Sequence, residues 1–126
     1  MSEKKLLMIV ELGGYPDFSP IYRTAGYQVE SASSMRKALS LLKKNDYAMV
    51  VCEFNFQSDF RDRTSSLESM MAVLQRKPET QIIVFYEQEF AHQFERISSR
   101  FPFHAALSFP IDEQVLSVSV NTAGQV

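Results

Sequence analysis

Unbroken apolar runs are the main feature of the hydrophobic pattern. Residues 47–52 (YAMVVC) are apolar in succession, and similar runs occupy residues 6–10 (LLMIV) and most of residues 81–86 (QIIVFY). A half-exposed strand alternates apolar and polar residues, whereas a short continuous run is typical of a strand covered on both faces of a parallel sheet. The pattern therefore predicts three buried strands.

The segments around these runs predict two more strands. Residues 27–31 alternate as an edge or half-covered strand does, and residues 105–109 form a short last strand. Between residues 13 and 24 most signals are those of turns, with room for only a turn or two of helix at residues 20–24. The first connection is therefore expected to be poorly helical.

Apolar residues at helical spacing predict helices over residues 35–42, 67–74 and 90–101. Ser33 or Ser34 is a candidate cap for the first, and Thr64 or Ser65 with Glu68 resembles a capping box for the second. Residues 56–63 are expected to form a long loop. The last segment, residues 112–120, is ambiguous because its alternation LSVSV suits a strand as well as a helix. Its position in the series favours a helix.

Strands that alternate with helices over short connections predict a five-stranded parallel sheet with helices on both faces. The length of 126 residues fits one domain, residues 1–126. For a chain of this size we expect the flavodoxin-like, three-layer arrangement with strand order 2-1-3-4-5, whose switch point lies between the first and third strands.

Composition narrows the classes of partner. The chain is 45% apolar and 22% charged, with a net charge of -2, so no basic field favours nucleic acid. The apolar run at residues 6–10 is far too short for a signal sequence or a membrane span. The single cysteine, Cys52, leaves no thiol pair for a disulfide or a metal. These features predict a cytoplasmic protein that binds neither nucleic acid nor membrane.

Carboxylates follow two of the predicted buried strands: Glu11 follows residues 6–10 and Glu53 follows residues 47–52. The switch point of the expected fold would bring both into one crevice. Glu11, Glu53 and the carbonyl of Asn55 are weak candidates for a metal site. His92 and His104 lack a partner at ligand spacing, and we assign no metal and no cofactor.

The sequence resembles the receiver domain of two-component response regulators from about residue 5 to residue 120. The matching pieces are LLMIVE, GYQVESASSMRKALSLLKKNDYAMVVCEFN, QIIVFY and LSFP. The resemblance implies that Glu53 occupies the position of the phosphorylated aspartate. Glu11 and Leu12 stand where two acids hold Mg²⁺ in the family.

The other two chemical positions of the family have also changed. A threonine or serine at the end of the fourth strand is Tyr86 here, and the lysine before a proline is Phe109, before Pro110. None of the five positions keeps its usual residue. The resemblance therefore implies a degenerate phosphoacceptor pocket and a pseudo-receiver, which is a protein-interaction module rather than an enzyme. Residue size suggests that Tyr86 and Phe109 close this pocket to phosphate from opposite sides.

Receivers pair with each other or with output partners through the fourth helix, fifth strand and fifth helix. The resemblance places an interaction surface on the corresponding residues, Phe90, Phe94, Ile97, Phe101, Leu107, Val115 and Val118. The partner would be another protein, an attached output or kinase domain, or a second copy.

Two alternatives remain open from the sequence. The first is a working phosphoacceptor receiver that uses Glu53 or a loop acid, Asp59 or Asp62. The second is a binder of a small molecule or nucleotide in the switch-point crevice.

Overall fold

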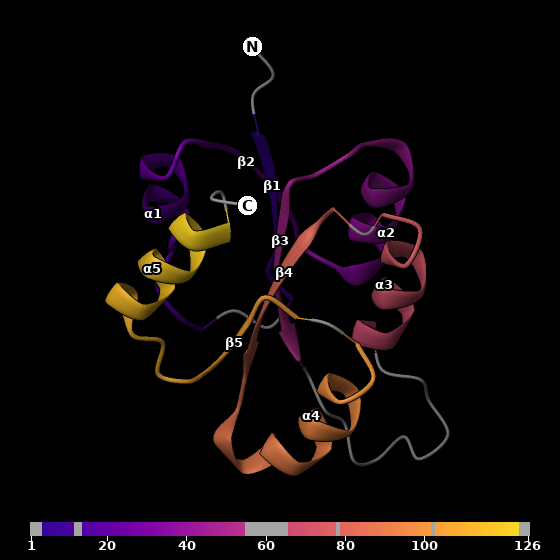
Figure 1. The fold of residues 1–126 in the computed structure, drawn as a ribbon, viewed down its shortest axis with the longest axis vertical. Helices are drawn as coiled ribbons and strands as arrows, with labels where there is room; N and C mark the ends of the chain where they lie inside the picture. Colours follow the sequence, from indigo (N-terminus) through magenta and orange to yellow (C-terminus); the bar gives the residue numbers. More distant parts are fainter. Residues whose placement is uncertain (1–3, 12–13, 55–65, 78, 102, 124–126) are drawn as a thin grey trace.

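The computed structural model describes residues 4–11, 14–54, 66–77, 79–101 and 103–123. It contains one parallel sheet between two layers of helices (Figure 1). The strands are β1 (Lys4–Ile9), β2 (Tyr27–Ala32), β3 (Met49–Phe54), β4 (Gln81–Tyr86) and β5 (Ala105–Ser108). The helices are α1 (Ser19–Thr24), α2 (Met35–Lys44), α3 (Ser66–Leu74), α4 (Ala91–Ser98) and α5 (Glu113–Ala123), with a 3₁₀ turn at Gln88–Phe90 before α4.

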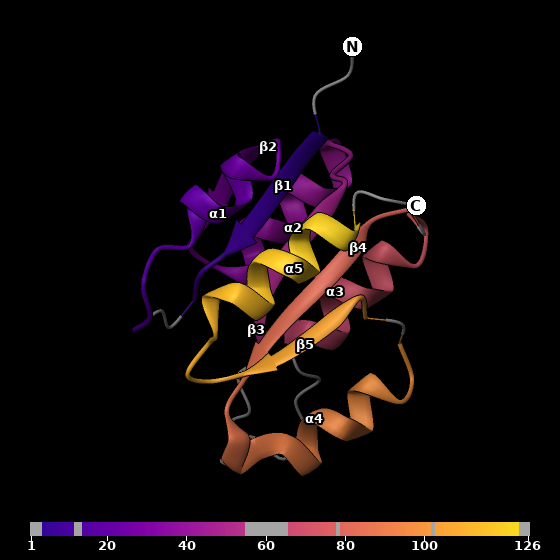
Figure 2. The same cartoon turned by 60° about the vertical axis from the view of Figure 1, so that its left-hand side comes forward.

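The strand order is β2-β1-β3-β4-β5, and every neighbouring pair is parallel. This confirms the predicted flavodoxin-like arrangement. β3 lies in the middle of the sheet and all six of its residues are buried, as the long apolar run predicted. Figure 2 shows β1 and β4 on either side of it.

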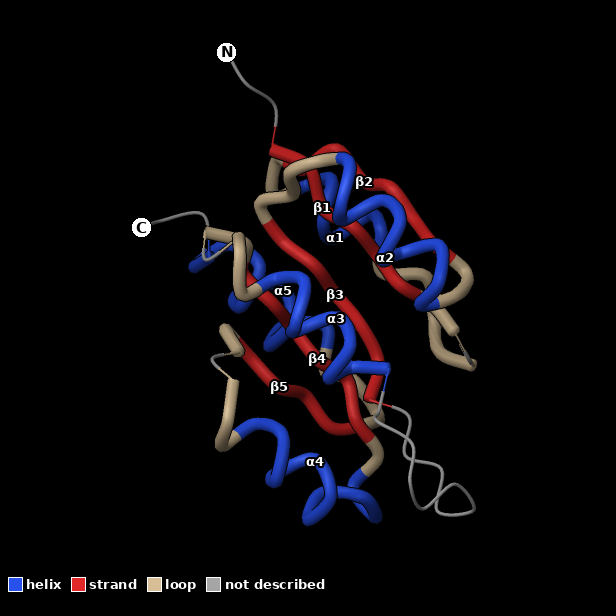
Figure 3. Tube along the Cα trace, turned by 90° about the vertical axis from the view of Figure 1, so that its right-hand side faces the viewer, coloured by secondary structure: helices blue, strands red, loops and turns tan. Residues whose placement is uncertain are grey.

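Two apolar clusters cover the two faces of the sheet. One joins α2, α3 and α4 to the side chains of Val50, Cys52 and Phe54, and Figure 3 views the sheet from the side of α2 and α3. The other joins the α1 region and α5 to Met49 and Val51. Successive side chains of a strand point to opposite faces, so β3 supplies both clusters in turn.

The first connection contains little helix, as predicted. α1 has six residues, with Pro20 in its first turn, and the Asp17 carboxylate accepts a hydrogen bond from the backbone N–H of Ser19 at 2.9 Å. Gly26 ends the segment at φ +97°, a left-handed conformation that suits glycine.

Two element boundaries differ clearly from the expectation, and the last segment is the helix that its position in the series favoured. β3 runs two residues past the apolar run, so Glu53 lies within the strand, where it pairs in register with Phe85. The helix expected over residues 90–101 becomes a 3₁₀ turn followed by α4, which ends at Ser98. The ambiguous last segment is a helix, α5, because Leu116 and Val120, one turn apart, both reach the core.

Two further expectations lie outside the described residues. These are the capping box at Thr64 or Ser65 and the loop over residues 56–63. None of the helices in the described part of the chain is long and apolar enough to cross a membrane.

Candidate functional site

Glu53 is a buried carboxylate beneath a tyrosine. It lies near the carboxyl end of the central strand, on the face of Met49 and Val51, and is 3% exposed. The Tyr15 hydroxyl donates a hydrogen bond to Glu53 Oε2 at 2.6 Å, the short distance typical of a charge-assisted bond. Burial, and next the hydrogen bond to Glu53, raise the pKa of Tyr15 above its ordinary value of 10.0. Tyr15 therefore stays protonated and donates across the physiological range.

An aromatic cluster surrounds this hydrogen bond. Its members are Tyr15, Phe18, Phe85 and Phe109. The Tyr15 ring stacks on Phe18 at a centroid distance of 5.8 Å, meets Phe85 edge to face at 5.5 Å and lies 5.3 Å from Phe109. Tyr15 is the centre of the cluster, and the rings close the sheet edge next to Glu53 with apolar surface.

Phe109 occupies the end of β5 opposite the β4 terminus. Its backbone N–H donates to the carbonyl of Tyr86 at 3.0 Å, and its ring packs against Phe85 and Tyr15. Pro110 follows it and is exposed. Phe109 is thus an apolar wall of the site.

The expectation that Tyr86 closes the pocket opposite Phe109 is wrong. Phe85 shares its face of the sheet with Glu53, so the next residue, Tyr86, points to the other face. There the Tyr86 ring stacks on Phe94 with centroids 4.8 Å apart. Tyr15, and not Tyr86, packs beside Phe109 and covers Glu53. The only feature of the sequence that pointed to Tyr15 was a pair of aromatic residues, Tyr15 and Phe18, within a turn-rich segment.

Several residues of the expected site, among them the metal candidate Asn55 and the alternative phosphoacceptors Asp59 and Asp62, lie outside the described residues. Leu12 is not described either, while Glu11 follows β1 and is half-buried. Burial, with smaller effects of the Glu11 and Glu53 charges, raises the pKa of the Cys52 thiol. Both carboxylates thus act on the same part of β3.

Within the described residues, no group of three or more His, Cys, Asp or Glu side chains is arranged to hold a metal ion. The described surroundings of Glu53 include the Tyr15 hydroxyl and the ring of Phe85 beside it. The two histidines lie elsewhere: His92 is exposed on α4, and His104 Nε2 is 2.8 Å from the carbonyl oxygen of Ser119.

The residues expected to form an interaction surface separate into two groups. Phe94 and Ile97 are each 5% exposed and belong to the core, so they offer no surface to a partner. Phe90, Phe101 and Leu107 are half-buried against the core clusters. The sequence expectation erred here because the helical stripe of α4 faces inward. Val115 and Val118 on α5 are 46% and 65% exposed.

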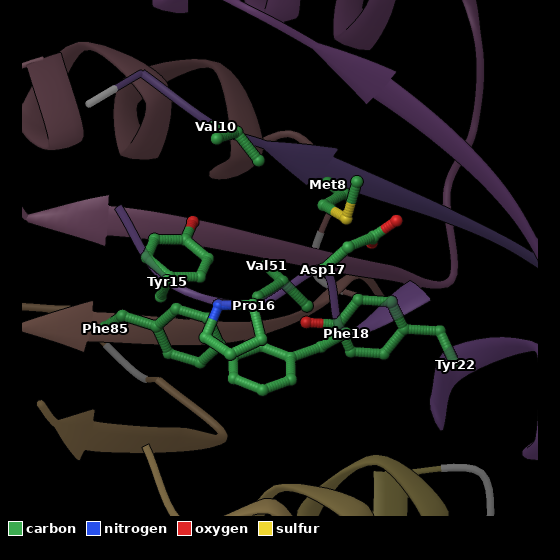
Figure 4. A pocket seen from close by; sticks show the side chains of 9 residues that line it. All are labelled: Met8, Val10, Tyr15, Pro16, Asp17, Phe18, Tyr22, Val51 and Phe85. Carbon is green, nitrogen blue, oxygen red and sulfur yellow. The ribbon is translucent and has the colours of Figure 1, made fainter. Parts of the chain in front are cut away.

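Two cavities flank Tyr15, and sequence reasoning missed both. One, of about 250 Å³, is shown in Figure 4 and is lined by Met8, Val10, Tyr15, Pro16, Asp17, Phe18, Tyr22, Val51 and Phe85. The other, of about 540 Å³, is lined by Gly14, Tyr15, Pro16, Phe18, Glu87, Phe109, Pro110, Ile111 and Glu113. Tyr15, Pro16 and Phe18 belong to both and separate them.

Solved receiver structures resemble this fold over almost its entire length. A response regulator receiver domain protein (CheY-like) from Methanospirillum hungatei superposes with a TM-score of 0.75 at 14% identity, covering 98% of both chains. A response regulator receiver domain protein from Clostridium thermocellum gives 0.74 at 18% identity, over 95% of this chain and 93% of the other.

A third similar structure comes from a protein that has diverged in function. It is described as a member of a family of redox sensors in the streptococci that evolved from two-component response regulators. The TM-score is 0.75 at 16% identity, over 97% of this chain and 51% of that one. No family model matches the chain, and no curated protein does. The fold is that of CheY-like receiver domains.

Proposed function

We propose that this protein is a pseudo-receiver, a signalling module of the two-component type that binds a protein without being phosphorylated and catalyses no reaction itself. The observation that carries the proposal is the buried Glu53 carboxylate, capped by the Tyr15 hydroxyl. The receiver fold supports a place in signal transduction, and the aromatic cluster is the reason for assigning no phosphoryl transfer.

Phosphorylation of a carboxylate needs an oxygen that the phosphorus atom of the donor can approach in line. Glu53 is 3% exposed, and its Oε2 accepts the tyrosine hydrogen bond. The carboxylate also stands one methylene farther from the backbone than an aspartate would. A donor would reach it only after Tyr15 had left the cluster.

The charge that develops on a transferred phosphoryl group also needs cations or hydrogen-bond donors around it. Phe109 stands where a receiver has its lysine, and its ring packs on Tyr15 and Phe85. The Tyr86 hydroxyl belongs to the opposite face of the sheet, where its ring stacks on Phe94. This side of the site thus consists of apolar rings, which do not stabilise the negative charge of a phosphoryl group.

A carboxylate that stays buried in the core is consistent with an interaction module whose output surface keeps one conformation. Receivers change their output surface when the charge at this position changes. Here the negative group is part of the folded core, and the hydrogen bond from Tyr15 joins it to the segment before α1. The output surface would then be set by folding and not by a phosphodonor.

The exposed valines of α5 are the proposed contact for a partner. Val115 and Val118 are three residues apart on α5, so they lie on one side of the helix, and both are largely exposed. The partner is a separate protein, an attached output or kinase domain, or a second copy of this chain. Half-buried Leu107 on β5 and Phe90 and Phe101 beside α4 are the proposed edge of this surface.

The test is the mass of the intact protein after incubation with acetyl phosphate or phosphoramidate and Mg²⁺, with a Glu53→Ala variant beside it. An unchanged mass supports the proposal. A phosphoryl group present on the wild type and absent from the variant would overturn it in favour of a phosphoacceptor receiver. A group present on both would point to another acceptor, such as Asp59 or Asp62, and would overturn it equally.

A further inference from the structure

The smaller of the two cavities lies on the face of the sheet covered by α1 and α5. Its nine lining residues come from β1 and the residue after it, from β3 and β4, from the segment that leads into α1 and from α1 itself. In Figure 4 the rings of Pro16, Phe18, Tyr22 and Phe85 gather on one side, and Met8 and Val10 lie on the other. Glu53 and Phe109 do not line it, but Tyr15, Phe18 and Phe85 do, so the cavity adjoins the aromatic cluster described above.

The size of the cavity limits the ligand. Pockets for drug-sized ligands measure roughly 300 to 1,000 Å³, and a cavity of about 150 Å³ accommodates benzene. At about 250 Å³ this one accommodates a compact group of ring size. A nucleotide does not fit it.

One side of the cavity wall is rich in aromatic residues. Four of the nine lining residues, Tyr15, Phe18, Tyr22 and Phe85, carry aromatic rings. Phe18, Tyr22 and Phe85 are almost fully buried and packed against their neighbours, so their rings are held in place. The face of an aromatic ring is electronegative, and several rings around one space attract a cation, above all a quaternary ammonium group.

The only charged residue in the wall is acidic. Of the nine lining residues, all of which the structure describes, Asp17 alone carries a formal charge, and none is a lysine or an arginine. Its Oδ1 accepts the Ser19 N–H at 2.9 Å. Hydrogen bonds from Ser19, and to a smaller extent the charge of Arg23, lower the pKa of Asp17 below its ordinary value. The carboxylate is therefore ionised at neutral pH.

One nearby cation competes for this carboxylate. Arg23 follows on α1, and its Nη1 donates to Ser19 Oγ at 3.2 Å, which directs part of its hydrogen bonding to the serine. Among the influences that lower the pKa of Asp17, the charge of Arg23 is the smallest. The wall thus combines aromatic rings with one exposed carboxylate.

We infer that this cavity binds a small organic cation, a quaternary ammonium group of the choline type, with the rings of Tyr15, Phe18, Tyr22 and Phe85 against the charge and the Asp17 carboxylate near it. A neutral molecule of the same shape would gain the apolar contacts alone. An anion would meet both the ring faces and Asp17, and is disfavoured.

Methyl NMR of the whole chain tests this inference with a matched pair of probes. Choline and 3,3-dimethylbutan-1-ol have the same shape, but only choline is charged. The reporters are the methyl groups of Met8 and Val51, which line the cavity. We expect choline to shift both saturably and to bind about tenfold more tightly than the alcohol, the difference expected from cation–π contact near an anion.

Two variants separate the cavity from a general charge effect. Asp17→Asn keeps an oxygen for the Ser19 N–H and removes the charge, so it should weaken choline binding and leave the alcohol unchanged. Glu95→Gln removes one exposed charge on α4, far along the chain from the cavity, and should change neither. Equal affinity for the two probes, no saturable shift with choline, or an equal loss in both variants would overturn the inference.

Discussion

The Tyr15 hydroxyl and the Glu53 carboxylate, 38 residues apart in the chain, are joined by a hydrogen bond of 2.6 Å. The bond connects the segment before α1 to the central strand, and Phe18, Phe85 and Phe109 pack around it. In the proposed pseudo-receiver, this buried acid stands where a receiver carries the acid that is phosphorylated.

Tyr15→Phe should destabilise the fold, because the buried Glu53 oxygen would lose its tyrosine donor. We expect the free energy of unfolding in urea to fall by about 1 to 3 kcal/mol. The matched control is Tyr47→Phe, which removes a bond of the same length to Glu30, a residue whose side chain is 34% exposed and also pairs with Lys5. Water can replace that bond, so the control should lose less. A loss in Tyr15→Phe no larger than in the control would contradict this account of Glu53.

Alkaline pH should destabilise the protein through its tyrosines. Burial raises the pKa of Tyr15, Tyr22 and Tyr47 above the ordinary value of 10.0. These groups keep their protons in the folded state after the unfolded chain has lost them. Their contribution is complete below about pH 9 and is lost as the pH rises above about 10. Urea unfolding between about pH 8 and pH 11 should show this fall.

The same titration isolates the contribution of Tyr15. Tyr15→Phe should lower the slope of unfolding free energy against pH above about pH 10 by close to one proton. A slope that Tyr15→Phe leaves unchanged would contradict a buried, hydrogen-bonded Tyr15 hydroxyl.

The exposed α5 valines should affect association and not stability. In a Val115→Glu, Val118→Glu double variant, each substitution should change the free energy of unfolding by no more than about 0.5 kcal/mol, because both positions are exposed. If the partner is a second copy, sedimentation over a range of concentrations should show a weaker dimer for the variant. The control is Gln114→Glu, an exposed position on the same helix.

Two results would contradict a self-association surface there. The first is a dimer that the double variant does not weaken, which would place the contact elsewhere. The second is a wild-type protein that remains monomeric at every concentration, which would exclude a second copy as the partner.

The sequence predicted the fold well because the burial of strands and helices determines where apolar residues occur along the chain. The unbroken runs in β1, β3 and β4 indicated strands covered on both faces, and the spacing of strands and helices indicated the parallel order. α5 was the hard case, since its LSVSV alternation suits both structures. Leu116 and Val120 decide it by packing on the sheet one helical turn apart.

The site was predicted only in part. The pattern of residues along a strand predicts where its side chains lie, whereas a turn-rich segment has no pattern that predicts the direction of its side chains. Glu53 was found from its position after an apolar run. Tyr15 was not, since nothing local in the turn-rich segment fixes where its side chain points. Tyr86 was expected beside the pocket from the resemblance and its size, but the register pairs Phe85 with Glu53, so Tyr86 lies on the other face.

The mass of the intact protein after treatment with acetyl phosphate and Mg²⁺ tests the central claim most directly. The measurement should include the wild type, Glu53→Ala, and Tyr15→Ala, which uncovers the carboxylate. The account predicts no added phosphoryl group on the wild type over a time course in which a known receiver is fully modified. A phosphoryl group on the wild type that Glu53→Ala abolishes would contradict it, because the hydrogen bond from Tyr15 and the cluster around it would then not close the site.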